Sequence, residues 1–328
     1  MDKFIPAFDF QRVFVAPWAD DFVGTGLVAL MGLFVSVACG LVGNYLILRR
    51  MALVGDAISH SVLPGIAIAF LLAKDRSTPV MFAGALAAGV VTTILIEVIH
   101  KKSRVKQDAA IGIAFTSLFA IGVILISLFA SKIDLDQECV LYGEIAFVPF
   151  QAPTTLFGIS LGPTPVFRMG MVAAITLLLI ILFYKELLVS SFDPGLATSL
   201  GINAGVMHYA LMCWLSVVVV SAFESVGAIL VIAMLILPGA TASLLATRLP
   251  VVQTLTVFHA AVSSVAGLHL AMWLDCSTAG AMVVAGSVLF LGAWLFSPTQ
   301  GLIRRFARGK IVAPEAMTEG PLAAEVKA

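Results

Sequence analysis

The chain has 328 residues, of which 60% are hydrophobic and 12% charged; a soluble domain is only about 45–50% apolar, so lipid must be the solvent for much of this chain. Its formal net charge of zero argues against a nucleic-acid partner. The four cysteines are scattered and form no Cys-x-x-Cys pair, which suggests neither a disulfide framework nor a thiolate metal site.

Residues 1–21 precede the first apolar run and mix acidic, basic and aromatic side chains. They lack the basic, apolar and small-residue order of a cleavable signal peptide. We therefore expect an extracytoplasmic interfacial segment that stays on the mature protein.

Apolar runs of about 20 residues, the length that a bilayer core of about 30 Å requires, follow one another from residue 22 to residue 300. They lie near residues 22–48, 53–73, 79–99, 109–131, 167–188, 206–223, 226–247, 251–274 and 277–297. Very short connections separate the last runs, so some of these can be half-helices. The pattern predicts an all-α integral membrane protein, a polytopic bundle of about seven to nine transmembrane helices with some helices broken.

Lysine and arginine gather at alternate ends of these runs, and cytoplasmic loops carry the excess of positive residues. The residues concerned are Arg49, Arg50, Lys101, Lys102, Arg104, Lys106, Arg248, Arg304, Arg305, Arg308 and Lys310. We expect their side to be the cytoplasm, with the N-terminus outside and the C-terminus inside.

Two segments are too polar to span a membrane. Residues 131–165 are rich in proline and acidic residues, which predicts an external loop that is either simply solvated or a cation-facing mouth or docking surface. Residues 301–328 begin with basic residues and continue without apolar periodicity. They predict a basic and then disordered cytoplasmic tail.

Ionisable residues inside apolar runs are costly, and by default they mark a pathway or a site. Asp56 and His60 are four residues apart, which places a carboxylate and an imidazole on one face of a helix. Pro64 and Gly65 follow directly, and we expect them to break or kink that helix. The alternative is that Asp56 and His60 form a structural hydrogen-bonded pair.

Glu224, followed by a second Leu-Pro-Gly sequence at Pro238 and Gly239, marks a similar interruption in the second half of the chain. Interrupted apolar segments in both halves point to a substrate site between them. Asp56, His60 and Glu224 would supply carboxylate oxygen and imidazole nitrogen, which suit a borderline divalent ion such as Mn, Fe or Zn. Glu224 could instead lie in an external turn.

His208, His259 and His269 are lone polar residues in apolar runs. We interpret them as interhelical hydrogen-bond donors and leave them out of the candidate site.

Residues 190–204 lie on the predicted cytoplasmic side and carry the signals of a short helix. Asp193 and Pro194 are residues that favour a turn. The stretch from there to Leu200 is long enough for one or two helical turns, and Gly201 can end the helix. A short amphipathic helix there would dock a soluble partner, and an ordinary connecting loop is the alternative. The sequence has no Gly-x-x-x-x-Gly-Lys-Ser/Thr motif, so another subunit would have to bind any ATP.

These segments resemble the permease subunits of ABC-type manganese, zinc and iron importers, in order and spacing over nearly the whole chain. The similarity is carried by Leu48 to Met51 running into Gly55 to Gly65, by Asp193-Pro194 with Leu200-Gly201-Ile202, and by Val226 to Leu230 with Pro238 to Ala242. The first of these motifs is the most specific.

The resemblance implies a multi-pass subunit of a bacterial plasma (inner) membrane that imports a divalent metal ion by alternating access and is not itself an enzyme. No permanently bound cofactor is implied, because the Mn, Zn or Fe ion is the transported substrate. The implied partners are cytoplasmic ABC ATPase subunits, an extracytoplasmic metal-binding protein, a second permease copy or paralogue, and membrane lipid.

The resemblance also implies roles for the candidate residues. Asp56 and His60 match positions that face the translocation path in such families, whereas the position of Glu224 varies. The segment with Asp193, Pro194, Leu200 and Gly201 would couple the permease to its ATPase.

Two other functions compete with this reading. A proton-coupled secondary metal transporter, in which Asp56 or Glu224 carries a proton, would work without an ATPase. An intramembrane zinc protease would need a constellation such as His-Glu-x-x-His, which the sequence lacks.

Overall fold

A computed structural model describes residues 6–74, 78–129, 145–156, 159–297 and 301 of the chain. Within these ranges, 8 helices are long and apolar enough to cross a membrane, and a shorter apolar helix spans Leu230–Leu245. The prediction of a polytopic helical bundle is confirmed, and the protein is a multi-pass membrane protein. The predicted tail, residues 301–328, lies outside the described residues except for Gly301.

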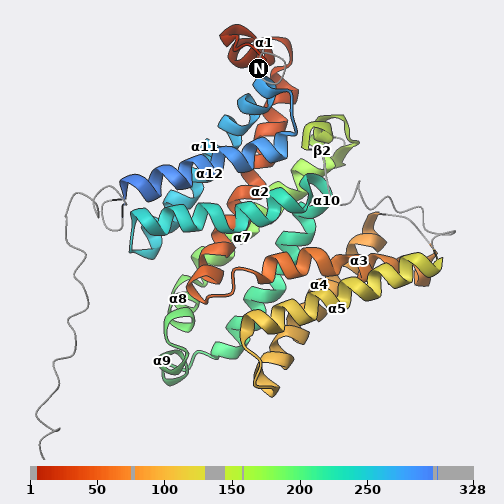
Figure 1. The fold of residues 1–328 in the computed structure, drawn as a ribbon, viewed down its shortest axis with the longest axis vertical. Coiled ribbons are helices and arrows are strands. Elements are labelled where there is room, and N and C mark those ends of the chain that lie inside the picture. Colours follow the sequence, from red (N-terminus) through yellow and green to blue (C-terminus); the bar gives the residue numbers. More distant parts are fainter. Residues whose placement is uncertain (1–5, 75–77, 130–144, 157–158, 298–300, 302–328) are drawn as a thin grey trace, which may run out of the picture.

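The elements follow one another as in Figure 1. They are η1 (Gln11–Val15, π-helical), α1 (Ala16–Asp20), α2 (Phe22–Leu48), α3 (Val54–Ala73), α4 (Thr78–Lys102), α5 (Gln107–Phe129), η2 (Ile145–Phe150, 3-10), β1 (Pro153–Leu156), β2 (Ile159–Pro163), α7 (Thr164–Leu182), α8 (Tyr184–Phe192), α9 (Pro194–Ser199), α10 (Ala204–Leu245), α11 (Leu249–Leu274) and α12 (Thr278–Phe296).

Helices α2 and α10 form the middle of the molecule, and two groups of helices lie on either side of them. Figure 1 shows α3, α4 and α5 gathered on one side and α11 and α12 on the other. Helix α10 contacts α2, α3 and α4 as well as α11 and α12, so it joins the two groups. Most of α2 is buried, including Val35, Leu41 and Tyr45.

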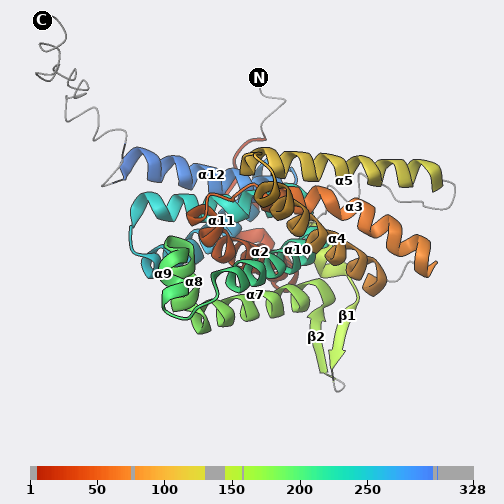
Figure 2. The ribbon, with the colours of Figure 1, turned by 90° about the horizontal axis from the view of Figure 1, so that it is seen from below.

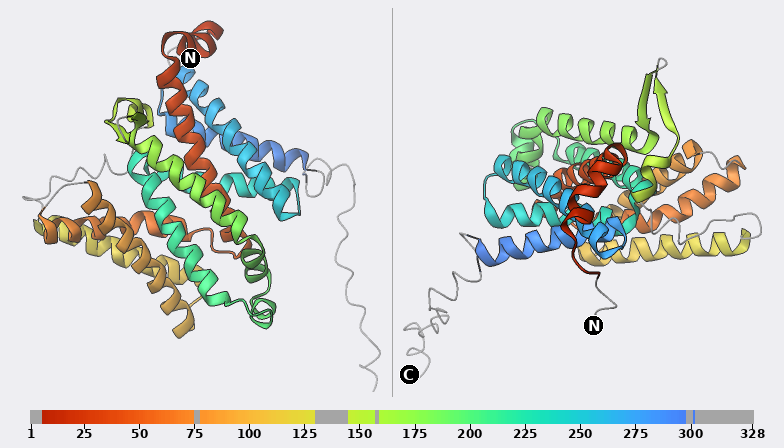
Figure 3. Two further views of the ribbon diagram at one scale, coloured as in Figure 1. Left: turned by 180° about the vertical axis from the view of Figure 1, so that it is seen from behind. Right: turned by 90° about the horizontal axis from the view of Figure 1, so that it is seen from above.

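The predicted external loop, residues 131–165, is described only in its second half. There η2 is followed by an antiparallel hairpin in which Pro153 pairs with Pro163 and Thr155 with Ser160. The hairpin projects from the helical body on the side of α7 (Figures 2 and 3). The acidic part of the loop lies in residues 130–144, outside the described residues.

The N-terminal segment packs against the end of α11. The carbonyl oxygen of Val13 accepts a hydrogen bond from His269 Nδ1 at 2.9 Å, and Trp18 Nε1 donates to His269 Nε2 at 3.4 Å. Because a carbonyl only accepts, His269 carries its proton on Nδ1. His259 Nε2 likewise lies 3.2 Å from the carbonyl oxygen of Gly286 in α12. Both histidines therefore join separate elements, as the sequence predicts.

The two Leu-Pro-Gly sequences do not interrupt their helices, and the kink that the sequence analysis offers as the alternative stays a prediction. Helix α3 runs without interruption through Pro64 and Gly65, and α10 continues through Pro238 and Gly239. The non-helical residue of α10 is Gly227, with φ 76° and ψ 167°. That conformation is open to glycine and strained for other residues.

The two Pro-Gly pairs instead allow close approach of neighbouring helices. A Cβ atom added to Gly122 of α5 would lie 2.8 Å from Pro64 Cδ, and one added to Gly40 of α2 would lie 3.2 Å from Pro238 Cβ. Each proline ring thus fills the space left by a glycine on the adjacent helix. Small residues at helix contacts are the usual means of tight association within a membrane.

Gly43 of α2 has the closest constraint at the crossing with α10. A Cβ atom there would collide with the backbone carbonyl oxygen of Leu235, which cannot move aside as a flexible side chain can. Gly26 of the same helix has nothing within 4 Å of an added Cβ.

We therefore predict opposite effects for alanine at these two positions. Gly43→Ala should destabilise the protein by about 1–3 kcal/mol or more, as overpacked sites do. Gly26→Ala should leave stability unchanged or raise it by roughly 0.5–1 kcal/mol. Thermal unfolding of the two purified variants, compared with wild type, checks this. Equal melting temperatures for Gly43→Ala and wild type would contradict the tight crossing of α2 and α10.

Candidate functional site

Asp56 and His60 lie in the first two turns of α3, side by side on one helix face. The chain reverses after α2 because Arg50 adopts a left-handed conformation with φ 59°, and Met51 N–H donates to the carbonyl oxygen of Leu46 at 2.8 Å. Helix α3 then begins at Val54, so Asp56 stands in its first turn, where a carboxylate complements the positive end of the helix dipole.

The pair keeps one side open. His60 Nε2 lies 3.3 Å from Asp56 Oδ1, and the two side chains are 35% and 33% exposed respectively. Phe115 and Phe119 of α5 flank the imidazole at ring-centroid distances of 5.7 and 6.1 Å. Ile58, on the opposite face of α3, is fully buried. The carboxylate and the imidazole are therefore accessible on a side that the described residues leave uncovered.

The pair can offer a metal ion one carboxylate group and one imidazole nitrogen. Among the described residues there is no group of three or more His, Cys, Asp or Glu side chains that could hold a metal ion. Protein-bound zinc usually takes four ligands, and manganese sites take more oxygen donors. Further ligands for an ion at Asp56 and His60 must then come from water, another chain or residues outside the described part.

Glu224 lies within α10, three residues before the break at Gly227. Its side chain falls outside the described part of the structure. The sequence-based association of Glu224 with Asp56 and His60 thus stays a prediction.

The segment predicted to dock a partner forms the short helix α9, capped at both ends. Asp193 Oδ1 accepts hydrogen bonds from the N–H groups of Gly195 (2.9 Å) and Leu196 (3.0 Å), and Pro194 occupies the first turn. At the other end Gly201 adopts φ 81°, and Ile202 N–H donates to the carbonyl oxygen of Ala197 at 2.9 Å. This is a Schellman cap. The predicted short helix is present, with bounds Pro194–Ser199.

Three large apolar side chains of this segment are exposed. Phe192, Leu196 and Leu200 are 65%, 49% and 62% exposed, while Ala197 is buried against the rest of the protein. Helices α8 and α9 lie at one extremity of the molecule in two opposite views (Figures 1 and 3). We call residues 192–200 the docking segment.

A polar cluster beside the docking segment was not predicted from the sequence. His208 Nε2 lies 3.1 Å from Glu97 Oε2, and His208 Nδ1 lies 3.0 Å from Arg49 Nη1. Burial lowers the pKa of the Arg49 guanidinium and nearby Tyr45 raises it, and arginine stays protonated at neutral pH. The sequence predicts His208 only as an interhelical hydrogen-bond donor, because its partners Arg49 and Glu97 lie far away along the chain.

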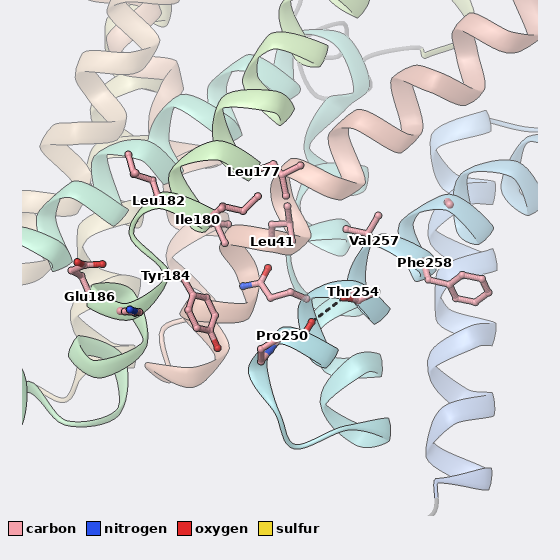
Figure 4. Close-up of a pocket in the computed structure, with 14 residues that line it drawn as sticks. Leu41, Leu177, Ile180, Leu182, Tyr184, Glu186, Pro250, Thr254, Val257 and Phe258 are labelled. Carbon is pink, nitrogen blue, oxygen red and sulfur yellow. Dashed lines mark hydrogen bonds between the residues drawn. The ribbon is translucent and has the colours of Figure 1, made fainter.

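A cavity of about 1050 Å³ lies away from the Asp56–His60 pair, between α2, α7, α8 and α11. Figure 4 shows apolar side chains such as Leu177, Ile180 and Val257 around it, with Tyr184 and Glu186 at one end. Neither Asp56 nor His60 lines this cavity, so it takes no part in the candidate site.

Comparison with known proteins agrees with these features. Over residues 22–297 the sequence matches the ABC 3 transport family. It is 46% identical over 277 residues to the manganese transport system membrane protein MntD of Bacillus subtilis (strain 168), which is 84% of this chain and 93% of that protein. It is also 46% identical over 278 residues to the zinc transport system membrane protein TroD of Treponema pallidum (strain Nichols), covering 85% of this chain and 75% of TroD.

Among solved structures, the fold is similar to a chain of PsaBC from Streptococcus pneumoniae in complex with Fab. The TM-score is 0.72 and the sequence identity 34%, over 91% of this chain and 100% of that chain. The family match over residues 22–297 includes both α3, which carries Asp56 and His60, and the docking segment.

The cap at Asp193 gives a prediction for α9. Asp193→Ala should remove about 0.5–2 kcal/mol of helix stability, because the N–H groups of Gly195 and Leu196 lose their acceptor. Asp193→Asn keeps an equivalent cap and serves as the matched control. Limited proteolysis of the purified protein should cleave the docking segment faster in Asp193→Ala alone. Equal cleavage of both variants would show that the cap does not hold α9.

Proposed function

The chain belongs to the ABC 3 transport family, and from this premise we propose that it is the membrane-spanning permease subunit of an ATP-binding-cassette importer for divalent transition-metal ions, Mn, Zn or Fe. The single observation that carries the metal assignment is the open carboxylate–imidazole pair of Asp56 and His60 inside an apolar helix. A borderline divalent ion suits that pair of donors, whereas an alkali ion rarely selects imidazole. The named relatives act on manganese and on zinc.

The permease works by alternating access and performs no covalent chemistry. A metal ion sheds part of its water and is held by Asp56 and His60 while the path is closed on both sides. Two ligands from one chain make an incomplete site, so a second permease copy or paralogue contributes the others across the dimer axis, with Glu224 as a further candidate from α10. The site must also release its ion, so a small set of ligands is an advantage.

ATP acts through a separate cytoplasmic subunit that binds at the docking segment. The sequence contains no phosphate-binding loop of its own. Exposed Phe192, Leu196 and Leu200 form an apolar patch on a capped, rigid helix, which suits a groove on a soluble partner. The opposite side of the membrane receives the ion from an extracytoplasmic metal-binding protein.

A proton-coupled secondary metal transporter is the alternative function for the same pair of residues. Asp56 or Glu224 would then carry a proton, and transport would not need an ATPase. Membership of a family whose named relatives are subunits of transport systems favours the ATP-driven importer.

Uptake measurements test the Asp56–His60 pair, which we call the metal pair. We predict that Asp56→Ala and His60→Ala each lower ATP-dependent uptake of radioactive Mn, Zn or Fe by about tenfold or more, since even loss of a group that only orients a ligand costs about 10–100-fold in metal affinity. Cells should carry the permease with its ATPase and metal-binding protein, at matched membrane abundance. Asp108→Ala and His100→Ala are the controls, because these two residues have the same side-chain chemistry, are exposed and do not belong to the pair.

Undiminished uptake in both pair variants would make Asp56 and His60 a structural pair. Uptake by wild type that persists with a hydrolysis-deficient ATPase, and that collapses with a protonophore, would favour the secondary transporter.

Co-purification tests the docking segment. Leu200→Asn should reduce recovery of the ATPase subunit with the permease by about fivefold or more, the effect of removing one apolar contact at the centre of an interface. Leu72→Asn is the matched control, because Leu72 is also an exposed leucine, with 81% of its surface exposed, and lies outside the docking segment at the C-terminal end of α3. Equal recovery of the ATPase with both variants would place its binding site elsewhere.

A further inference from the structure

A cluster of polar side chains lies between the end of α8, which leads into the docking segment, and the ends of α2, α4 and α10. We call it the Arg49 cluster, and it draws its members from α2, α4, α8 and α10. Its members are Arg49, Glu97, Lys101, Ser190, Ser191 and His208.

The guanidinium of Arg49 holds three partners at once. Its Nε donates to Ser191 Oγ at 3.0 Å, its Nη2 to Ser190 Oγ at 3.1 Å, and its Nη1 lies 3.0 Å from His208 Nδ1. The guanidinium is planar with its donors in a fixed fork. The end of α2, the end of α8 and the start of α10 are therefore held in one relative arrangement.

The direction of the remaining hydrogen bonds follows from Arg49. A guanidinium can only donate, so His208 Nδ1 is the acceptor and the imidazole proton resides on Nε2. His208 Nε2 then donates to Glu97 Oε2 at 3.1 Å, and Glu97 Oε1 accepts from Lys101. A continuous chain of donors and acceptors thus runs from α8 through Arg49 and His208 to α4.

The position of Arg49 in the chain connects this cluster to the metal pair. Arg49 directly follows α2, and the tight turn after it leads into α3, whose first turn contains Asp56. Ser190 and Ser191 stand at the end of α8, just before Asp193, the cap of α9. The side chain of Arg49 thus bonds to the two residues directly before the docking segment. Its backbone continues through the turn after α2 into α3.

Most of the hydrogen-bonding groups of the cluster are shielded from water. Glu97 and Ser190 are buried, and the side chain of His208 is only 19% exposed. Buried polar networks are stable when every member is satisfied, and removal of one member leaves others without partners. The cluster therefore moves as a unit or has to be broken at a definite cost.

We propose that the Arg49 cluster couples the docking segment to the metal pathway, with Arg49 and His208 as positioning residues that transmit its movement to α3 and α4. This inference rests on the proposed function, because it presupposes an ATPase that moves the docking segment. Neither residue touches the metal ion or ATP in this account. Loss of either side chain should uncouple ATP hydrolysis from metal transport.

The test uses the complete importer, permease with ATPase subunits and metal-binding protein, reconstituted in vesicles. The measured quantity is the number of metal ions taken up for each ATP hydrolysed. His208→Leu should lower this ratio by about two- to thirtyfold, the range of coupling that such networks carry, while the ATPase rate is retained. His208→Gln should restore the ratio, because its amide can accept from Arg49 and donate to Glu97.

His100→Leu is the matched control, since His100 lies on α4 beside Lys101 but is exposed, with its Nδ1 3.3 Å from the carbonyl oxygen of Val105. The ratio should stay at the wild-type value in this variant. Should His208→Leu fail to fold, the double variant Ser190→Ala with Ser191→Ala removes the α8 acceptors of Arg49 with little change in volume. It should lower the ratio in the same way.

An unchanged ratio in His208→Leu, or a parallel loss of uptake and ATPase activity that His208→Gln does not rescue, would overturn the inference and leave a purely structural cluster. Absence of ATP-driven metal uptake by the wild-type complex would instead refute the proposed function itself. The two failures are therefore distinguished by the wild-type measurement alone.

Discussion

The interior of a membrane offers no water to a polar group, and this constraint explains much of the structure. Every ionisable or strongly polar side chain there must find a partner within the protein. Glu97 finds Lys101 and His208, and His269 finds the N-terminal segment. Asp56 and His60 bond to one another, yet they remain about one-third exposed. We propose that a transported cation binds at this partly exposed pair.

The same constraint explains why helices stay intact where the sequence suggests breaks. A free backbone carbonyl is expensive in lipid, so proline is tolerated where a neighbouring helix comes close. Pro64 and Pro238 each face a glycine on the adjacent helix, Gly122 and Gly40. The non-helical residue in α10 is Gly227, which can adopt a φ of 76° because glycine has no Cβ atom. Proline in these spans marks helix packing, and glycine alone marks the break.

The sequence predicts those features that depend on neighbouring residues. Apolar runs predict the spans, because their length must match the bilayer. The four-residue spacing of Asp56 and His60 predicts their contact, and the sequence from Asp193 to Gly201 predicts α9 from its two caps. The Arg49 cluster could not be predicted in this way. Arg49 and His208 are separated by 159 residues, and only the packing of α2 against α10 brings them together. The sequence-based grouping of Glu224 with Asp56 and His60 stays a prediction, because the described residues bring no third His, Cys, Asp or Glu side chain to the pair.

We propose that Asp56 and His60 hold the transported ion, and a measurement that observes the ion itself tests this proposal. X-ray absorption spectroscopy of the reconstituted permease, loaded in turn with Mn, Zn and Fe, reports the atoms that surround the bound metal. We expect imidazole scattering around at least one of these metals, lost in His60→Gln and retained in His100→Gln. A bound metal with oxygen ligands only, or with imidazole scattering that survives in His60→Gln, would contradict it.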